Sequence, residues 1–247
     1  MKILGIIPAR YASTRFPGKP LADINGKSMV QRVYEQALAA KCLSDVVVAT
    51  DDERIFKHLE ALAYNVVYTK SSHQSGTDRC AEVIHQHYKD VEVVINIQGD
   101  EPFINPLQIE ELAACFTDER TDIATLIKKI DHTSELFNVN KPKVVKSEED
   151  FALYFSRQPI PFLRNVEESE WLNHHVYFKH IGIYGYKTEV LKKVTQLAVS
   201  ALEKAESLEQ LRWLENGFKI KVKQTDFEAV AIDTPEDLQM LLNRNNG

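Results

Sequence analysis

Short apolar runs and amphipathic stretches alternate through the first half of the chain. The apolar runs are rich in Val and Ile, and they predict buried strands at residues 2–7, 45–49, 65–68 and 91–97. The stretches between them repeat apolar residues three and four positions apart, and they predict helices at residues 27–40, 52–62, 77–88 and 106–116. Strands that alternate with helices indicate right-handed βαβ units and a mostly parallel sheet.

The pattern changes after about residue 120. Four further strands are expected close together, at residues 123–130, 143–147, 152–156 and 179–186. A helix at 203–215, a strand at 218–223 and a last helix from Pro235 to about residue 243 follow. No linker rich in Gly, Ser or Pro divides the chain. We therefore expect an α/β fold, with a mostly parallel twisted sheet flanked by helices, in one domain over residues 1–247. An antiparallel lobe is expected to be inserted at approximately residues 131–190.

Composition excludes several classes of protein. The chain has 247 residues, of which 44% are hydrophobic and 27% charged, as in ordinary globular proteins. No apolar run approaches the ~18–20 residues of a membrane span, and residues 1–7 are too short for the apolar core of a signal peptide. The net charge of -6 argues against nucleic acid or a membrane surface as a partner. Cys42, Cys80 and Cys115 lack a CxxC spacing, which indicates reduced thiols and a cytoplasmic protein.

The glycine positions exclude two common phosphate-binding loops. No two of the nine glycines are separated by a single residue, so the GxGxxG fingerprint of dinucleotide-binding folds is absent. The Gly-Lys pairs at 18–19 and 26–27 lack the preceding glycine that a P-loop requires. A phosphate site in this chain must therefore use another loop.

The segment 8–20 is a candidate for that loop. It carries Arg10, Arg15 and Lys19, and no acidic residue precedes Asp23. It follows the first predicted strand, at the carboxyl edge where open α/β sheets bind ligands. Arg can hold phosphate oxygens with two donors, and Lys can follow a moving charge. A solvated basic loop is the alternative interpretation.

Two aspartates follow apolar stretches and are candidate metal ligands. Asp100 lies in QGDEP after the fourth strand, where Gly99 allows a close approach of backbone to a ligand. A turn in which Asp100 caps local amides explains that motif equally well. Asp233 precedes Pro235, and local sequence favours helix N-capping for it. A metal role for Asp233 requires a second carboxylate nearby, such as Asp100 on the same sheet edge.

Arg157, Arg164 and His180 are polar residues within apolar or aromatic stretches of the expected lobe. Together they suit an acidic, hydroxylated ligand, although each alone is more typical of a surface or structural residue. No residue has the setting of a covalent nucleophile, and the cysteines are interpreted as small core residues.

Seven segments occur in the order and spacing of one known family. They are PARYASTRFPGKPL (8–21), HQSGTDR (73–79), NIQGDEP (96–102), ALYFSR (152–157), IGIYGY (181–186), SLEQLR (207–212) and DTPEDL (233–238). On these segments the chain resembles the 3-deoxy-D-manno-octulosonate cytidylyltransferase family, also called CMP-Kdo synthetases. The resemblance implies a Rossmann-like nucleotide-diphospho-sugar transferase fold. It also implies homodimers formed through the inserted lobe, and synthesis of CMP-Kdo and pyrophosphate from CTP and Kdo for lipopolysaccharide.

The resemblance also implies roles for individual residues. Catalysis would rest on Lys19, Asp100 and Arg10, and Mg²⁺ would be held by Asp100 and Asp233. The CTP-binding residues would be Arg10, Ser13, Arg15, Lys19, Ser75, Gly76, Arg79 and Gln98. The sugar-binding residues would be Gln98, Arg157, Arg164, His180, Tyr184, Glu209 and Gln210.

Two alternatives stay open at this point. The sugar could be another acidic sugar, such as 8-amino-Kdo or sialic acid. The chain could also be an inactive nucleotide-binding protein on the same fold, although the presence of Lys19, Asp100 and Asp233 argues against that.

Overall fold

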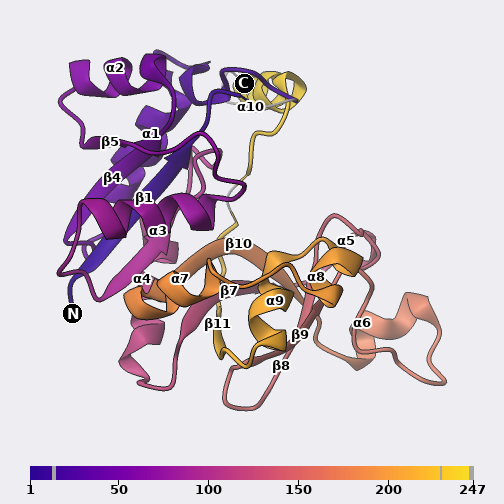
Figure 1. Cartoon of the computed structure of the whole chain (residues 1–247). Helices are drawn as coiled ribbons and strands as arrows, with labels where there is room; N and C mark the ends of the chain where they lie inside the picture. Colours follow the sequence, from indigo (N-terminus) through magenta and orange to yellow (C-terminus); the bar gives the residue numbers. More distant parts are fainter. Residues whose placement is uncertain (13–14, 229, 245–247) are drawn as a thin grey trace. The chain divides into compact units, whose positions relative to one another are not determined.

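The structure is a computed structural model that describes residues 1–12, 15–228 and 230–244. The chain forms two compact units (Figure 1). Unit 1 joins Met1–Ala113 to the C-terminal segment that begins at residue 229, and unit 2 is Ala114–Glu228. Unit 2 is wider than the insertion expected at residues 131–190. The reason is that the strands flanking the expected insertion pair with each other and with strands inside it.

Unit 1 is built on a parallel sheet, as predicted. The strands are β1 (Ile3–Ala9), β4 (Asp45–Thr50), β5 (Val66–Tyr68) and β6 (Val93–Asn96). Strand β1 lies between β4 and β6, and Ile6 is in register with Val47 on one side and Asn96 on the other. Both faces of β1, β4 and β6 are buried, which explains why the sequence shows continuous apolar runs rather than an alternation. The carboxyl ends of β1, β4 and β6 therefore lie at one edge.

The helices of unit 1 begin where the sequence places capping residues. They are α1 (Met29–Leu38), α2 (Glu53–Ala61), α3 (Gly76–Gln86), α4 (Pro106–Ala114) and α10 (Pro235–Arg244). Ser28 caps α1 and Asp52 caps α2, and Ser75 forms a capping box with Asp78 at the start of α3. Helix α3 packs on strands β1, β4 and β6, so its capped N-terminus is fixed against the sheet.

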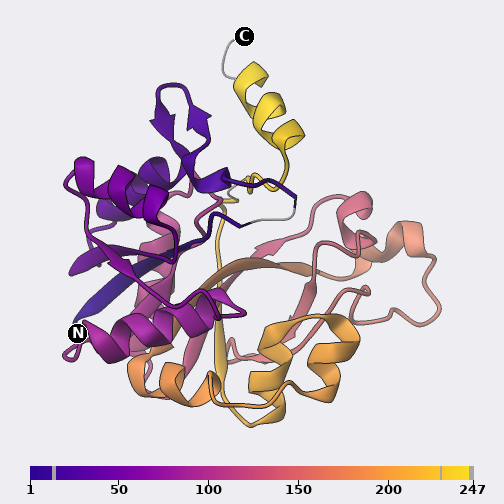
Figure 2. The ribbon, with the colours of Figure 1, turned by 45° about the horizontal axis from the view of Figure 1, so that its top comes forward.

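The C-terminal segment completes unit 1. Ile232 and Leu238 form a buried cluster with Ile24 and Met29 from the first thirty residues. Ile24 belongs to a hairpin of β2 (Asp23–Ile24) and β3 (Lys27–Ser28), and Figure 2 shows α10 beside it. The Ile232 N–H also donates to the Asp100 carbonyl over 2.9 Å. These contacts hold the residues before α10 next to the loop that follows β6.

Unit 2 is a mixed sheet with short helices. Strand β10 (Phe178–Lys187) pairs antiparallel with β7 (Ile123–Lys129) and, near its start, with β8 (Lys143–Lys146). Strand β9 (Ala152–Ser156) pairs antiparallel with β8, and β11 (Ile220–Gln224) runs parallel to β7. The helices are α5 (Thr133–Leu136), α6 (Trp171–His174), α7 (Thr188–Val194), α8 (Ala201–Glu206) and α9 (Glu209–Glu215).

The single helix predicted at residues 203–215 is wrong. Two helices, α8 and α9, lie there, and the first begins at Ala201 because Ser200 forms a capping box with Glu203. Ser207 has a φ of 52°, in the left-handed region, and this ends α8. The apolar spacing continues across the break, so periodicity alone did not reveal it. Within the part of the chain that the structure describes, no helix combines the length and apolar character needed to cross a membrane.

Candidate functional site

Unit 1 has a cavity of about 510 Å³ at the carboxyl edge of its sheet. It is formed by the loop after β1, the first turn of α3 and the loop after β6. Its lining residues are Pro8, Ala9, Arg10, Ala12, Arg15, Lys19, Pro20, Gly76, Arg79, Gln98, Gly99 and Asp100. Six of the expected CTP-binding residues are therefore gathered in one place. Ser75 caps α3 directly before Gly76, and Ser13 lies outside the described residues.

The basic loop after β1 is held closed by Tyr11 and Gly18. The Gly18 N–H donates to the Tyr11 carbonyl over 2.9 Å, and Gly18 has a φ of 74°. A Cβ at Gly18 would lie 3.0 Å from the Tyr11 ring. The Arg54 guanidinium stacks 3.2 Å from the centre of that ring, and Asp52 pairs with Arg54. These contacts hold Tyr11 and Gly18 together, and Lys19 is the next residue along the chain.

Gly99 places the loop after β6 directly against the end of β1. A Cβ at Gly99 would lie 2.7 Å from the Pro8 carbonyl oxygen, closer than real Cβ contacts occur. Only glycine therefore fits at this position. From sequence, Gly99 was expected to allow a close approach of backbone to a ligand. In the structure Gly99 lies close to the backbone of Pro8, and this contact brings Asp100 near the basic loop.

Lys19 joins the two candidate metal ligands. Its Nζ lies 2.7 Å from Asp100 Oδ2 and 3.3 Å from Asp233 Oδ1. Arg15 pairs with both oxygens of Asp233 at 3.1 Å each. Asp100 and Asp233 therefore do lie on the same edge, which is the condition that the sequence left open for a metal site.

Asp233 is not the cap of the last helix. The Thr234 hydroxyl accepts from the Asp237 N–H over 3.2 Å. In return, the Asp237 carboxylate accepts from the N–H groups of Asp233 and Thr234 at 3.0 and 2.9 Å. This reciprocal arrangement is a capping box, and it leaves the Asp233 carboxylate to face Lys19 and Arg15. The capping role favoured by local sequence belongs to Thr234.

The Asp100 and Asp233 carboxylates suit Mg²⁺. Their oxygens converge on one cationic nitrogen, so this point already favours a positive charge. Carboxylate oxygens are the hard ligands that Mg²⁺ prefers, and Mg²⁺ usually takes one or two of them with water and substrate phosphates. No cluster of three or more His, Cys, Asp or Glu side chains that could hold a metal occurs among the residues described. The remaining ligands would have to come from nucleotide and water.

Two buried charged groups support this edge, and the sequence analysis did not assign either role. Burial raises the pKa of Glu101 to about 7, with a further contribution from the charge of Asp100. Arg79 is fully buried, donates from Nη1 to the Thr69 hydroxyl, and places Nη2 3.3 Å from Asp51. Arg79 thus ties α3 to the ends of β4 and β5 beneath the cavity. Its expected contact with cytidine stays a prediction.

In unit 2, an aromatic and polar cluster surrounds His180. The Thr125 hydroxyl donates to the Ile183 carbonyl over 2.8 Å and can accept from His180 Nε2 at 2.9 Å. Burial lowers the pKa of His180 to about 4, so its ring is neutral at pH 7. The ring of Tyr184 lies 5.2 Å from that of His180 and 5.1 Å from that of Trp213, a residue the sequence analysis missed.

Several polar atoms of this cluster are buried without a hydrogen bond to any described residue. They are Tyr184 Oη, Gln210 Nε2 and Trp213 Nε1. Glu209 and Gln210 open helix α9, and the charge of Glu209 contributes to raising the pKa of Tyr184, after burial as the main cause. A cluster with unused donors is suited to a hydroxyl-rich ligand.

Arg157 is fixed at the break between α8 and α9. Its guanidinium donates to the carbonyls of Glu206, Val139 and Ser207 at 2.6, 3.0 and 3.2 Å, and its N–H donates to the Glu206 carboxylate at 2.9 Å. Arg164 is exposed on the segment that follows β9, and no contact in the described part of the chain joins it to the other sugar-site candidates.

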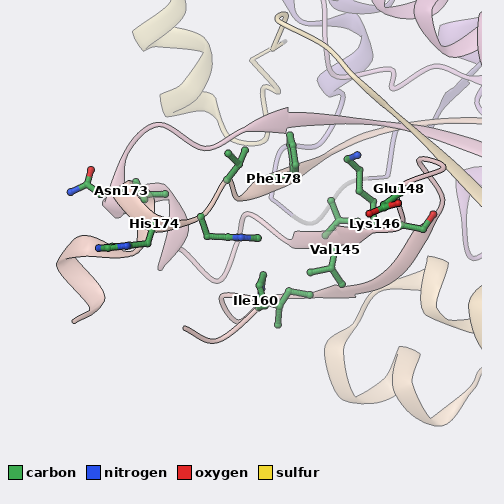
Figure 3. Close-up of a pocket in the computed structure, with 13 residues that line it drawn as sticks. Val145, Lys146, Glu148, Ile160, Asn173, His174 and Phe178 are labelled. Atoms are coloured by element: carbon green, nitrogen blue, oxygen red, sulfur yellow. The ribbon is translucent and has the colours of Figure 1, made fainter. Parts of the chain in front are cut away.

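A second cavity, of about 750 Å³, lies within unit 2 (Figure 3). It is lined by Val144, Val145, Lys146, Ser147, Glu148, Ile160, Pro161, Leu172, Asn173, His174, His175, Val176 and Phe178. None of the predicted nucleotide, sugar or metal residues is among them. His174 and His175 are both exposed.

Comparison with known proteins assigns the class. The profile of the family described as cytidylyltransferase matches residues 4–221, and the chain belongs to that family. Within it, a 3-deoxy-manno-octulosonate cytidylyltransferase from Parabacteroides distasonis is 56% identical over 246 residues, covering 98% of this chain and 97% of its own. The protein of the same name from Bacteroides thetaiotaomicron is 57% identical, covering 97% and 96%. The family expected from the seven segments is thereby confirmed.

Solved structures agree with this assignment. A structure of CMP:2-keto-3-deoxy-manno-octonic acid synthetase complexed with CTP has a TM-score of 0.92 at 40% identity, covering 100% of this chain and 99% of that chain. A cytidylyltransferase from Leptospira borgpetersenii has a TM-score of 0.62 at 17% identity, covering 98% and 85%, and it shares the fold alone.

Proposed function

We propose that the chain transfers CMP from CTP to Kdo, giving CMP-Kdo and pyrophosphate for lipopolysaccharide synthesis. The observation that carries the proposal is Lys19, held between Asp100 and Asp233 in a cavity lined by Arg10 and Arg15. The names of the high-identity relatives and the CTP in the neighbouring structure support the choice of substrates.

In the proposed reaction, the anomeric hydroxyl oxygen of Kdo forms a bond to the α-phosphorus of CTP. The bond from that phosphorus to the bridging oxygen breaks, pyrophosphate leaves, and the hydroxyl proton is released. Both reactants are anions, so their repulsion has to be reduced before they can meet. Arg10 and Lys19 do this by neutralising the phosphates, and Lys19 Nζ moves from the carboxylates to the charge that develops on the leaving group.

Asp100 and Asp233 are proposed to hold Mg²⁺. Mg²⁺ held by these two carboxylates would act as a Lewis acid that offsets phosphate charge and lowers the pKa of the attacking hydroxyl. Arg15 holds the Asp233 carboxylate in place by donating to both of its oxygens. For the sugar, Arg157 is proposed to attract the carboxylate, while His180, Tyr184 and Gln210 offer hydrogen bonds to the hydroxyl groups. Arg164, Glu209 and Gln98 complete the proposed set.

Pyrophosphate release by the wild-type protein tests this function. Each of CTP, UTP, ATP and GTP is combined with Kdo, 8-amino-Kdo and sialic acid in the presence of Mg²⁺. The highest kcat/KM is expected for CTP with Kdo, and none of the pairs should react in EDTA. A preference for 8-amino-Kdo or sialic acid would move the assignment to a related cytidylyltransferase, and CTP binding without product would indicate an inactive nucleotide-binding protein.

The proposed assembly is a homodimer formed through unit 2, in the cytoplasm. Phe162, Leu153 and Val176 expose 72%, 62% and 50% of their surface in this unit. Exposed apolar side chains of this kind support an interaction surface in unit 2. The unpaired state of Cys42, Cys80 and Cys115 accords with a reducing compartment.

Substituting Phe162 tests the dimer. Phe162→Glu is expected to shift the wild-type dimer to monomer in sedimentation velocity, because a charge in an apolar interface is costly. Leu38→Glu, at a residue 55% exposed on α1 in unit 1, is the matched control and should leave the dimer intact. A monomeric wild-type protein, or equal sedimentation of both variants, would refute the proposed interface.

A further inference from the structure

Unit 2 buries two lysines that face each other across neighbouring strands. Lys143 on β8 is in register with Lys179 on β10, and their exposures are 0% and 3%. Lys179 is neutralised, because its Nζ lies 2.6 Å from Glu135 and 2.7 Å from Glu228. Burial alone would lower the pKa of Lys179. The hydrogen bonds that Lys179 donates to these two carboxylates outweigh the effect of burial, so its pKa is raised. Lys179 thus has two carboxylate partners, which Lys141 and Lys128 also contact.

Lys143 has no such compensation. Its Nζ donates to the Asn138 carbonyl over 3.0 Å, and no carboxylate in the described part of the chain forms an ion pair with it. A carbonyl satisfies one donor but leaves the charge unbalanced. Burial therefore lowers the pKa of Lys143 to about 8. A buried charge without a direct ion pair destabilises the folded protein, and one hydrogen bond to a carbonyl does not offset that cost.

Arg157 and Glu206 are the charged groups that act on Lys143: the charge of Glu206 raises its pKa and that of Arg157 lowers it. Ser156 faces Lys143 across β8 and β9, and Arg157 is the next residue. Glu206 accepts from the Ser156 hydroxyl at 2.7 Å and from the Arg157 N–H at 2.9 Å. Two cations thus share a single carboxylate, which leaves a local excess of one positive charge. Arg157 is partly exposed, so an anion in solution can reach it, whereas Lys143 is fully buried.

We propose that Lys143 is a positioning residue for the carboxylate of the acidic sugar, acting through Arg157. The inference rests on the proposed function and adds a residue and a physical role to its sugar site. In a partly enclosed site, where the effective dielectric is low, a charge acts over several ångströms without contact. Glu206 offsets the positive charge of Arg157, and Lys143 restores it. The two cations together therefore attract a monocarboxylate that Arg157 alone would bind more weakly.

Lys143→Met tests the inference by a combination that a structural lysine cannot produce. KM for Kdo should rise about tenfold, with kcat and KM for CTP unchanged, because the lost field acts on sugar binding. The melting temperature should rise by about 2–4 °C, because an unbalanced buried charge is replaced by an apolar chain of similar length. Lys146→Met is the matched control. Lys146 lies on the same strand, β8, and forms an ion pair with Asp150 at 2.6 Å. The KM of this variant for Kdo should equal that of wild type.

The substrate charge provides the second half of the test. The methyl ester of Kdo, measured as a competitor of Kdo binding, should bind wild type and Lys143→Met equally, since it lacks the carboxylate. In wild type, KM for Kdo should rise with pH through about 8 as Lys143 loses its proton, and in Lys143→Met it should not. Arg157, Glu206 and the compensated Lys179 are the charged groups that neighbour Lys143, and the variant comparison separates their titration from that of Lys143.

The outcomes distinguish this inference from the proposed function. Wild-type turnover of Kdo combined with an unchanged KM in Lys143→Met, or a lower melting temperature with no sugar effect, would overturn the inference and leave the function standing. Absence of wild-type product would overturn the function, and calorimetric binding of Kdo to the two proteins then decides the inference, with equal affinities counting against it. If Lys143→Met does not fold, Lys143→Arg must retain Kdo affinity and its carboxylate preference, and a loss of either would refute the role of charge.

Discussion

Replacing Lys19 by methionine is expected to lower kcat by about 10²–10³-fold, with the fold intact. Lys19 Nζ pairs with both Asp100 and Asp233, and its side chain is only 15% exposed. In the proposed reaction it meets the charge that develops on pyrophosphate, an interaction stronger in the transition state than in the bound substrate. KM for CTP should therefore change less than kcat. Pyrophosphate release and circular dichroism provide the two measurements.

The same variant should also change the response to Mg²⁺. Lys19 pairs with both proposed metal ligands, so removing it removes a competing cation, and half-maximal residual activity should need less Mg²⁺. Lys27→Met is the control. Lys27 forms an ion pair with Glu35 at 2.7 Å, and it does not line the cavity. A near-normal kcat in Lys19→Met would contradict the proposal that Lys19 stabilises the charge on pyrophosphate in the transition state.

Asp100→Asn is expected to reduce kcat by at least about 10²-fold, because the substitution keeps the shape and removes the charge that a hard cation needs. Its Mg²⁺ requirement should rise, opposite in direction to that of Lys19→Met. Titration of activity with Mg²⁺ measures both effects. Asp23→Asn, at an exposed residue of the neighbouring hairpin, should behave as wild type. Unchanged activity and Mg²⁺ response in Asp100→Asn would exclude Asp100 as a ligand.

Sequence predicted the regular elements of unit 1 closely because each is decided locally. All strands expected from apolar runs are present with boundaries shifted by at most two residues. Burial on both faces of β1 and β4 requires consecutive apolar residues, and the pattern is then unambiguous. The helix break at Ser207 was missed because a single left-handed residue leaves no trace in apolar spacing.

The candidate site depended on distant contacts that local sequence does not encode. Asp233 and Thr234 are equally suitable caps in sequence, and only the hydrogen bonds of Asp237 decide between them. Lys143 and Lys179 look alike as polar residues within strands. Their difference arises from Glu135 and Glu228, of which Glu228 is 49 residues from Lys179. The sequence pattern singled out Arg157, Arg164 and His180, whereas the other sugar-site residues came from family resemblance. Trp213 had no signal beyond its apolar character.

The discontinuity of unit 1 has a consequence for biosynthesis. Lys19 and Asp233 are 214 residues apart, and the segment that carries Asp233 also supplies Ile232 and Leu238 to the cluster around Ile24. A ribosome therefore releases the strands of unit 1 long before it releases the residues that finish the cavity edge. The nascent chain can assemble its parallel sheet early, yet the cavity edge stays incomplete until synthesis has passed Asp233 and the residues that anchor it.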